Sequence, residues 1–178
     1  MHYLGIDPGA SGGLALLNDY DDSVWFKPTP HSELDIWNCI SGMLTDHGLD
    51  IYGASTHEEE LPLICSIEKV GGYVGKEQPG SAMFNFGWSY GGLRMVVVGL
   101  LGTLPQEITP QEWQKGLGIP PRKKSVKGQE GESQSQFKRR LKKQAETLFP
   151  NLHITLQTCD ALLIATYARQ KHLITRSG

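Results

Sequence analysis

Long apolar runs are absent from this chain of 178 residues. The longest, residues 95–101, has seven residues and includes a glycine, whereas a membrane-spanning helix needs about 20 apolar residues. The N-terminus has no basic stretch followed by a long apolar one, so no signal peptide is expected. Three widely spaced cysteines, Cys39, Cys65 and Cys159, form no Cys-x-x-Cys pair, which favours a reduced intracellular protein without a structural zinc.

Two common catalytic signatures are also missing. None of the six histidines has the His-x-x-x-His or His-Glu-x-x-His spacing, which argues against a zinc hydrolase. A Gly-Lys-Ser/Thr phosphate loop is absent as well, which argues against the P-loop NTPases. The composition, 39% hydrophobic and 20% charged, is that of an ordinary globular chain, so we expect residues 1–178 to form a single domain.

The net charge of −2 conceals a very uneven distribution of charged residues along the chain. Residues 122–143 contain nine Lys or Arg and two Glu, a net charge of +7, while the remainder carries −9. A concentrated basic segment on an acidic body indicates a polyanionic partner. Its Gly, Ser and Gln content predicts a flexible basic loop at about residues 121–136, followed by a basic helix over residues 137–148.

The order of the remaining elements predicts a mixed α/β fold with a five-stranded sheet flanked by helices. The strands are expected at residues 2–7, 13–17, 23–27, 63–68 and 107–109, and a further short strand is expected at 153–156. Polar or Gly-rich loops are expected at 53–60 and 71–80. The helices are expected at residues 31–47 and 81–101, from Pro110 to before Pro120, and from Thr158, as N-cap, through Ala168.

Three acids occupy informative places in this pattern. Asp7 and Glu68 each end a predicted strand, and Asp160 lies in the first turn of the last helix. Carboxylates that converge repel one another unless a cation neutralises them, and their hard oxygens suit Mg²⁺ or Mn²⁺. Such ions clamp a phosphate and ionise an attacking water. Taken singly, each acid can equally be a solvated strand end or helix cap.

Four motifs in order resemble the RuvC-type Holliday junction resolvases. Residues 5–9 read Gly-Ile-Asp-Pro-Gly and residues 67–70 read Ile-Glu-Lys-Val; the long helix at 81–93 and Asp-Ala-Leu-Leu-Ile-Ala at 160–165 follow. Each motif alone is weak, but together they span nearly the whole chain. Met-Phe-Asn-Phe-Gly at 83–87 and Thr-Pro-Gln-Glu-Trp-Gln-Lys at 109–115 most resemble the phage, cyanobacterial and plastid branch.

The resemblance implies an RNase H-like fold, a homodimer and Mg²⁺-dependent incision of four-way DNA junctions. It implies that Asp7, Glu68 and Asp160 hold two Mg²⁺ ions, with Mn²⁺ able to substitute, and that Lys138 lies near the scissile phosphate as a fourth catalytic residue. Gln157 departs from the pattern, because many members have an Asp there. The implied location is the cytoplasm of a bacterium or phage-infected cell, in association with the nucleoid, or an organelle for a plastid member.

The basic segment supplies the candidate DNA contacts, because phosphate contacts give affinity without sequence information. The predicted DNA-binding residues are Lys115, Arg122, Lys123, Lys124, Lys127, Lys138, Arg139, Lys142, Lys143 and Phe84. Phe84 is the candidate for a wedge or stacking platform at an opened junction. The competing interpretations are a solvated charged helix and, for the aromatics at 84–90, packing or a dimer interface.

Two other functions compete with a junction nuclease. An actin-like or sugar-kinase-like ATPase also begins with a Gly-Ile-Asp-Pro-Gly type loop, but it needs a second domain for which 178 residues leave no room. A non-catalytic DNA-architectural protein that binds junctions on the same fold is the alternative that Gln157 keeps open. Neither a membrane nor a small-molecule substrate is expected.

Overall fold

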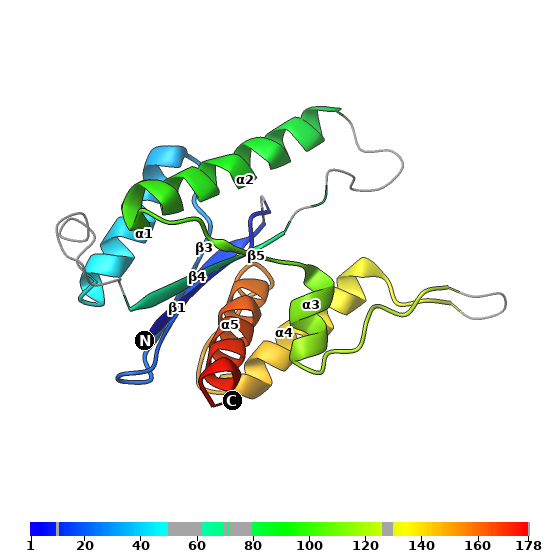
Figure 1. The fold of residues 1–178 in the computed structure, drawn as a ribbon. Helices are drawn as coiled ribbons and strands as arrows, with labels where there is room; N and C mark the ends of the chain where they lie inside the picture. The colour runs from blue at the N-terminus through cyan, green and yellow to red at the C-terminus, as the bar shows by residue number, and fades with distance from the viewer. Residues whose placement is uncertain (10, 50–61, 70, 72–79, 126–129, 178) are drawn as a thin grey trace.

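The computed structural model describes residues 1–178 except 10, 50–61, 70, 72–79, 126–129 and 178. The predicted loop at 53–60, most of that at 71–80, and Lys127 therefore lie outside the described residues. The described part contains a five-stranded sheet and five helices (Figure 1). This arrangement confirms the predicted α/β class.

The sheet has the strand order β3-β2-β1-β4-β5. Its strands are β1 (His2–Ile6), β2 (Gly13–Asn18), β3 (Val24–Pro28), β4 (Leu63–Glu68) and β5 (Gln106–Ile108). The first three form an antiparallel meander, whereas β1, β4 and β5 are parallel. Ile6 pairs with Ile67, so the next residues of the two central strands, Asp7 and Glu68, come to the same edge of the sheet.

Helices cover both faces of the sheet (Figure 1). The helices α1 (Glu33–Asp46) and α2 (Gly80–Leu101) lie on one face, and α3 (Pro110–Gly116), α4 (Gln134–Leu148) and α5 (Cys159–Ser177) lie on the other. Side chains alternate along β1 accordingly: Leu4 and Ile6 pack in the core under α1 and α2, while Tyr3 packs in the core under α5. The central strand is thus buried on both sides.

Local capping explains where the helices begin. Ser32 accepts a hydrogen bond from the backbone N–H of Asp35 at the start of α1. Thr109 does the same for Glu112, with Pro110 at the first helical position. Such side-chain acceptors satisfy backbone donors that the first turn leaves free.

The predicted loop at 121–136 is too long by three residues. Gln134 to Gln136 form the first turn of α4, because Ser133 and Gln136 make a reciprocal capping box in which each side chain accepts from the other's backbone N–H. The polar residues at 134–136 suggested a loop, but polar residues are also typical of the first turn of a helix with a capping box. Residues 121–125 and 130–133 are irregular, and their described part projects from α3 and α4 (Figure 1).

Three predictions near the helix ends are wrong in detail. Residues 153–156 are not a strand: residues 153–155 are irregular and a turn over 156–158 follows. The hydroxyl oxygens of Thr155 and Thr158 lie 3.1 Å apart and hydrogen bond across this segment. Thr158 precedes α5, but the hydrogen bonds of its side chain go to Thr155 rather than to the first helical turn. The helix α5 runs on past Ala168 to Ser177. The predicted extent of α3 is confirmed, since this helix begins at Pro110 and ends at Gly116, before Pro120.

Candidate active site

The three predicted acids come from three elements that meet at one edge of the sheet. Asp7 follows β1, Glu68 is the last residue of β4, and Asp160 is the second residue of α5. The helix α5 approaches β1 closely because Gly5 has no side chain: a Cβ there would lie 2.3 Å from the carbonyl oxygen of Ala161. This contact brings the first turn of α5, and with it Asp160, beside the end of β1.

Lys138 reaches two of the acids from α4. Its Nζ lies 2.5 Å from Oδ2 of Asp160 and 3.6 Å from Oδ2 of Asp7. The lysine side chain is 29% exposed, against 13% for Asp7 and 12% for Asp160. One ammonium group is therefore shared by two carboxylates at a mostly buried position.

Glu68 has a different partner that sequence reasoning missed. Its Oε2 accepts a hydrogen bond of 2.9 Å from the indole Nε1 of Trp113, which is fully buried in α3. A buried Trp N–H normally finds an acceptor, but nothing in the sequence indicates which one. Trp113 thus fixes one side of the third carboxyl group and links α3 to the site.

Burial and mutual repulsion oppose full ionisation of this cluster. Burial raises the pKa of Glu68 to about 7, with the Asp7 charge adding to the effect and the Trp113 hydrogen bond opposing it. Burial also raises the pKa of Asp7; Lys138 opposes this shift and Asp160 adds to it. Burial alone would lower the pKa of Lys138, but Asp160 and Asp7 together raise it to about 12. The lysine is therefore an ammonium throughout the physiological pH range.

These pKa shifts predict a pH-dependent stability of the metal-free protein. A carboxyl group with a pKa of about 7 when folded, against 4.5 ordinarily, binds more protons in the folded state, so stability falls as pH rises from 4.5 to 7. The raised pKa of Asp7 acts in the same direction. The wild-type protein should therefore lose on the order of 2 kcal/mol in its free energy of unfolding between pH 4.5 and pH 7. Glu68→Gln has no carboxyl group at this position and should not show that loss.

Thermal or urea unfolding measures this pH dependence of stability. The wild-type protein and Glu68→Gln are compared in a chelating buffer from pH 4.5 to pH 8. The variant should be the more stable protein at pH 8, and the difference between the two should shrink as the pH falls. Stability curves that run parallel from pH 4.5 to pH 8 would contradict a raised pKa for the carboxyl group of Glu68.

The site's donor chemistry fits a hard divalent cation. All three acids offer carboxylate oxygens, the ligands that Mg²⁺ and Mn²⁺ prefer, and the ammonium of Lys138 shows that a cation is accepted between Asp7 and Asp160. Within the described part of the chain, no three His, Cys, Asp or Glu side chains are already grouped as a metal site. Two acids are engaged by Lys138, and the third by Trp113.

The other predicted basic residues lie outside this cluster. Lys115, at the end of α3, and Arg139 and Lys143, on α4, are exposed, as are Arg122, Lys123 and Lys124 in the projecting segment. Lys142 pairs with Glu146 on the same helix at 3.1 Å.

Arg140, which was not among the predicted DNA contacts, holds the projecting segment in place. Its guanidinium group donates to both carboxylate oxygens of Glu132, at 3.0 and 2.9 Å, and to the carbonyl oxygen of Pro120 at 2.9 Å. The backbone N–H of Glu132 donates to the carbonyl oxygen of Lys123 at 2.9 Å. The two described sides of the segment are therefore tied together at its base.

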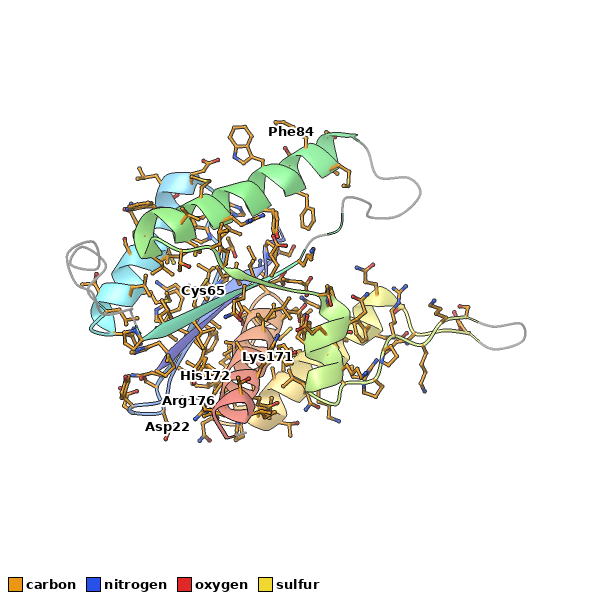
Figure 2. All side chains as sticks on the ribbon, viewed as in Figure 1. Asp22, Cys65, Phe84, Lys171, His172 and Arg176 are labelled. Carbon is orange, nitrogen blue, oxygen red and sulfur yellow. The ribbon has the colours of Figure 1, made fainter. Side chains whose placement is uncertain are left out.

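The aromatic residues of α2 divide into exposed and packed ones. Phe84 is 64% exposed and lies at the outer edge of α2 near its start (Figure 2), with its ring centroid 5.7 Å from that of Trp88, which is 60% exposed. Tyr90 instead packs on the core and donates to Glu107 at 2.8 Å. Phe84 and Trp88 help to line a cavity of about 550 Å³ that also includes Gly9, two residues after Asp7.

Gln157 lies in the turn before α5 with an exposed side chain. Its carbonyl oxygen would be 2.7 Å from a Cβ on Gly13, so its backbone packs against the start of β2, at the same edge of the sheet as Asp7. Position 157 is therefore close to the acids along the chain and in the fold.

These features define an RNase H-like fold with an acidic site at the end of its central parallel strands. Comparison with solved structures identifies this as the fold of RuvC. The chain is similar to Thermus thermophilus RuvC at 12% identity and a TM-score of 0.52, with 98% of this chain and 97% of that chain covered. It is equally similar to T. thermophilus RuvC in complex with a Holliday junction substrate: 13% identity, a TM-score of 0.52, and 98% and 96% covered.

The likeness to these solved structures is one of fold. No protein-family model matches the chain, and no curated protein matches it significantly. A search of the described helices finds none long and apolar enough to cross a membrane.

Proposed function

We propose that this protein is a metal-dependent DNA endonuclease that resolves four-way junctions. The observation that carries the proposal is the buried cluster of Asp7, Glu68 and Asp160 with Lys138 at the edge of an RNase H-like sheet. A solved T. thermophilus RuvC with this fold is described in complex with a Holliday junction substrate, which supports the choice of substrate. The protein would act where chromosomal or phage DNA is recombined.

The side chains have separable roles in this proposal. Asp7, Glu68 and Asp160 would hold Mg²⁺, or Mn²⁺ in its place, as two ions in each site. Bound there, the metal supplies an ionised water and charge neutralisation for the phosphodiester. Lys138 contributes a permanent positive charge beside the phosphate, and Trp113 orients Glu68 through its indole hydrogen bond.

A cleavage assay tests the proposal directly. The purified protein is incubated with a mobile four-way junction and with a duplex of the same sequence, each in Mg²⁺ and in EDTA. We expect nicks at symmetric positions in the junction, only with Mg²⁺, and little cleavage of the duplex. Tight junction binding without nicking in Mg²⁺ or Mn²⁺ would instead favour the non-catalytic, junction-binding alternative.

The basic segment is expected to provide salt-sensitive affinity. Replacing Arg122, Lys123 and Lys124 together by Gln should weaken junction binding and lower the slope of log affinity against log salt by about 2 to 3, because each lost phosphate contact releases about one counterion fewer. The protein's affinity for the junction, measured from 50 to 300 mM salt, reports the slope.

The control removes basic residues at the far end of α5, Lys171 and Arg176 (Figure 2). Their replacement by Gln should leave the slope close to that of the wild-type protein. An unchanged slope in the Arg122, Lys123 and Lys124 variant would mean that the projecting segment faces away from DNA.

We also propose a homodimer, because a junction presents two symmetry-related strands to cut and a two-fold enzyme matches them. The exposed side of α2 supports this choice of interface: Phe84, Trp88 and Met95 are each at least 60% exposed, and a Cβ at Gly87 or Gly91 would meet nothing within 4 Å. Such an open apolar strip lets a second helix approach closely.

Light scattering at micromolar concentration should give twice the chain mass of 19.7 kDa. Replacing Met95 by Glu should halve the measured mass, because a charge in an apolar interface is costly to bury. A monomer for the wild-type protein, with and without junction DNA, would contradict the dimer.

A further inference from the structure

The acid cluster already contains a cation of its own. The ammonium of Lys138 lies within 3.6 Å of Asp7 and 2.5 Å of Asp160, and these three side chains come from a helix, a strand end and a second helix. The packing of α4 on α5 through buried Leu141 and Ala145 holds the lysine there. The contact is thus built into the fold rather than made by neighbouring residues of one helix.

We propose that Lys138 is a displaceable internal cation: it neutralises Asp7 and Asp160 in the DNA-free protein, and a divalent metal ion must displace it to bind there. This inference rests on the proposed function, since it takes the acids as the metal ligands. It adds a regulatory step to that function, because the released ammonium group becomes available to a DNA phosphate. Metal loading and DNA binding would then favour each other.

The location of the lysine suits such an exchange. Its side chain is 29% exposed, so the ammonium group can return to solvent without disrupting the core. Asp7 and Asp160 are much less exposed and cannot leave. A divalent ion carries twice the charge of the ammonium and replaces it favourably, but it must first break an ion pair that solvent screens only partly.

Direct metal binding to the DNA-free protein tests this competition. Calorimetric titration with Mn²⁺ should show that Lys138→Met binds the ion about tenfold more tightly, or better, than the wild-type protein. The reason is that the competing unit charge, 3.6 Å from Asp7 and 2.5 Å from Asp160 in the wild-type protein, is gone. Met keeps the apolar stem of lysine without the charge. Lys138→Arg keeps the charge and should bind Mn²⁺ as weakly as the wild-type protein.

The matched control is Lys171→Met, which removes the same charge from the far part of α5. Lys171 pairs with Glu112 at 3.0 Å and is 52% exposed, so its loss should leave Mn²⁺ affinity unchanged. Equal Mn²⁺ affinities for Lys138→Met and the wild-type protein would overturn the proposal. An equal gain in Lys171→Met would overturn it too, because the effect would then come from net charge alone.

A second measurement, by NMR, follows Lys138 in the wild-type protein and so keeps the buried charge. The protein is labelled with ¹³C at lysine Cε, and the signal of Lys138 is identified as the one that is missing from the spectrum of Lys138→Arg. Titration with Mg²⁺ should move that signal while the signal of Lys171 stays in place. A Lys138 signal that does not respond at saturating Mg²⁺ would show that the ammonium group stays where it is, and would overturn the proposal.

The two proposals fail in different ways. Lys138→Met should bind Mn²⁺ more tightly and yet cleave junctions more slowly, because the lysine also serves the phosphate. If the wild-type protein nicks junctions but Lys138→Met shows no gain in Mn²⁺ affinity, the displacement is wrong and the nuclease stands. If the gain is present but no protein nicks DNA, the displacement stands and the nuclease is wrong.

Discussion

Asp7→Asn, Glu68→Gln and Asp160→Asn should each abolish junction cleavage while leaving junction binding intact or tighter. Each substitution keeps the size of the side chain and removes one negative charge. A neutral amide oxygen is a poor ligand for a hard cation, so the metal is lost or misplaced. Loss of a single preorganised electrostatic group costs on the order of 10²–10³-fold in rate. Binding survives because less negative charge beside a phosphate backbone does not weaken attraction.

Cleavage rates and junction affinities of the three variants, measured side by side in Mg²⁺, separate chemistry from binding. Asp22→Asn is the matched control, since Asp22 is exposed in the turn before β3 and pairs only loosely, at 3.7 Å, with Arg169 (Figure 2). It should cleave as the wild-type protein does. Any one of the three acid variants that retains the wild-type rate would remove that residue from the proposed site.

The fold was largely predictable because its strands and helices have strong local signals. The two central strands are short apolar runs, which is the pattern of a buried parallel strand. Each run is followed or ended by an acid. Two parallel neighbours end at the same edge, so the proximity of Asp7 and Glu68 follows from the strand pattern once the pairing is known. The first turn of α5 was placed by the interpretation of Thr158 as the residue that precedes the helix.

The contacts made by the acids were not predictable from local pattern. The hydrogen bond between Trp113 and Glu68 joins residues 45 positions apart, and Lys138 lies 22 positions from Asp160. Only the packing of α3 and α4 against α5 brings them together. The resemblance named Lys138 as a residue near the phosphate, but it does not specify that the ammonium group pairs with two acids in the absence of DNA.

The mispredicted segments share a physical cause. Residues 134–136 are polar in composition, yet a capping box between Ser133 and Gln136 makes them helical. Residues 153–156 have strand-like composition, but paired threonine hydroxyl groups hold a turn there while Ile154 is buried in the core. In both cases one side-chain hydrogen-bond pair overrides the composition of the segment.

Gly5→Ala should strongly destabilise the protein and displace the site at the same time. A Cβ at Gly5 would lie 2.3 Å from the carbonyl oxygen of Ala161 and 2.5 Å from the backbone nitrogen of Ala165. Both are backbone atoms of α5, so no side chain can rotate to relieve the clash, and β1 and α5 must separate. We expect a loss of about 3 kcal/mol in the free energy of unfolding, at the upper end of overpacking costs.

Because Asp7 follows β1 and Asp160 begins α5, the same separation should move the two acids apart and reduce cleavage even at temperatures where the variant is folded. Thermal unfolding should show a melting temperature lower by roughly 6–12 °C. Gly42→Ala is the matched control: Gly42 lies in α1, a Cβ there meets nothing within 4 Å, and alanine in a helix stabilises by about 0.5–1 kcal/mol relative to glycine. If Gly5→Ala melts with the wild-type protein, β1 and α5 do not pack as closely as described, and the route by which Asp160 reaches Asp7 would have to be revised.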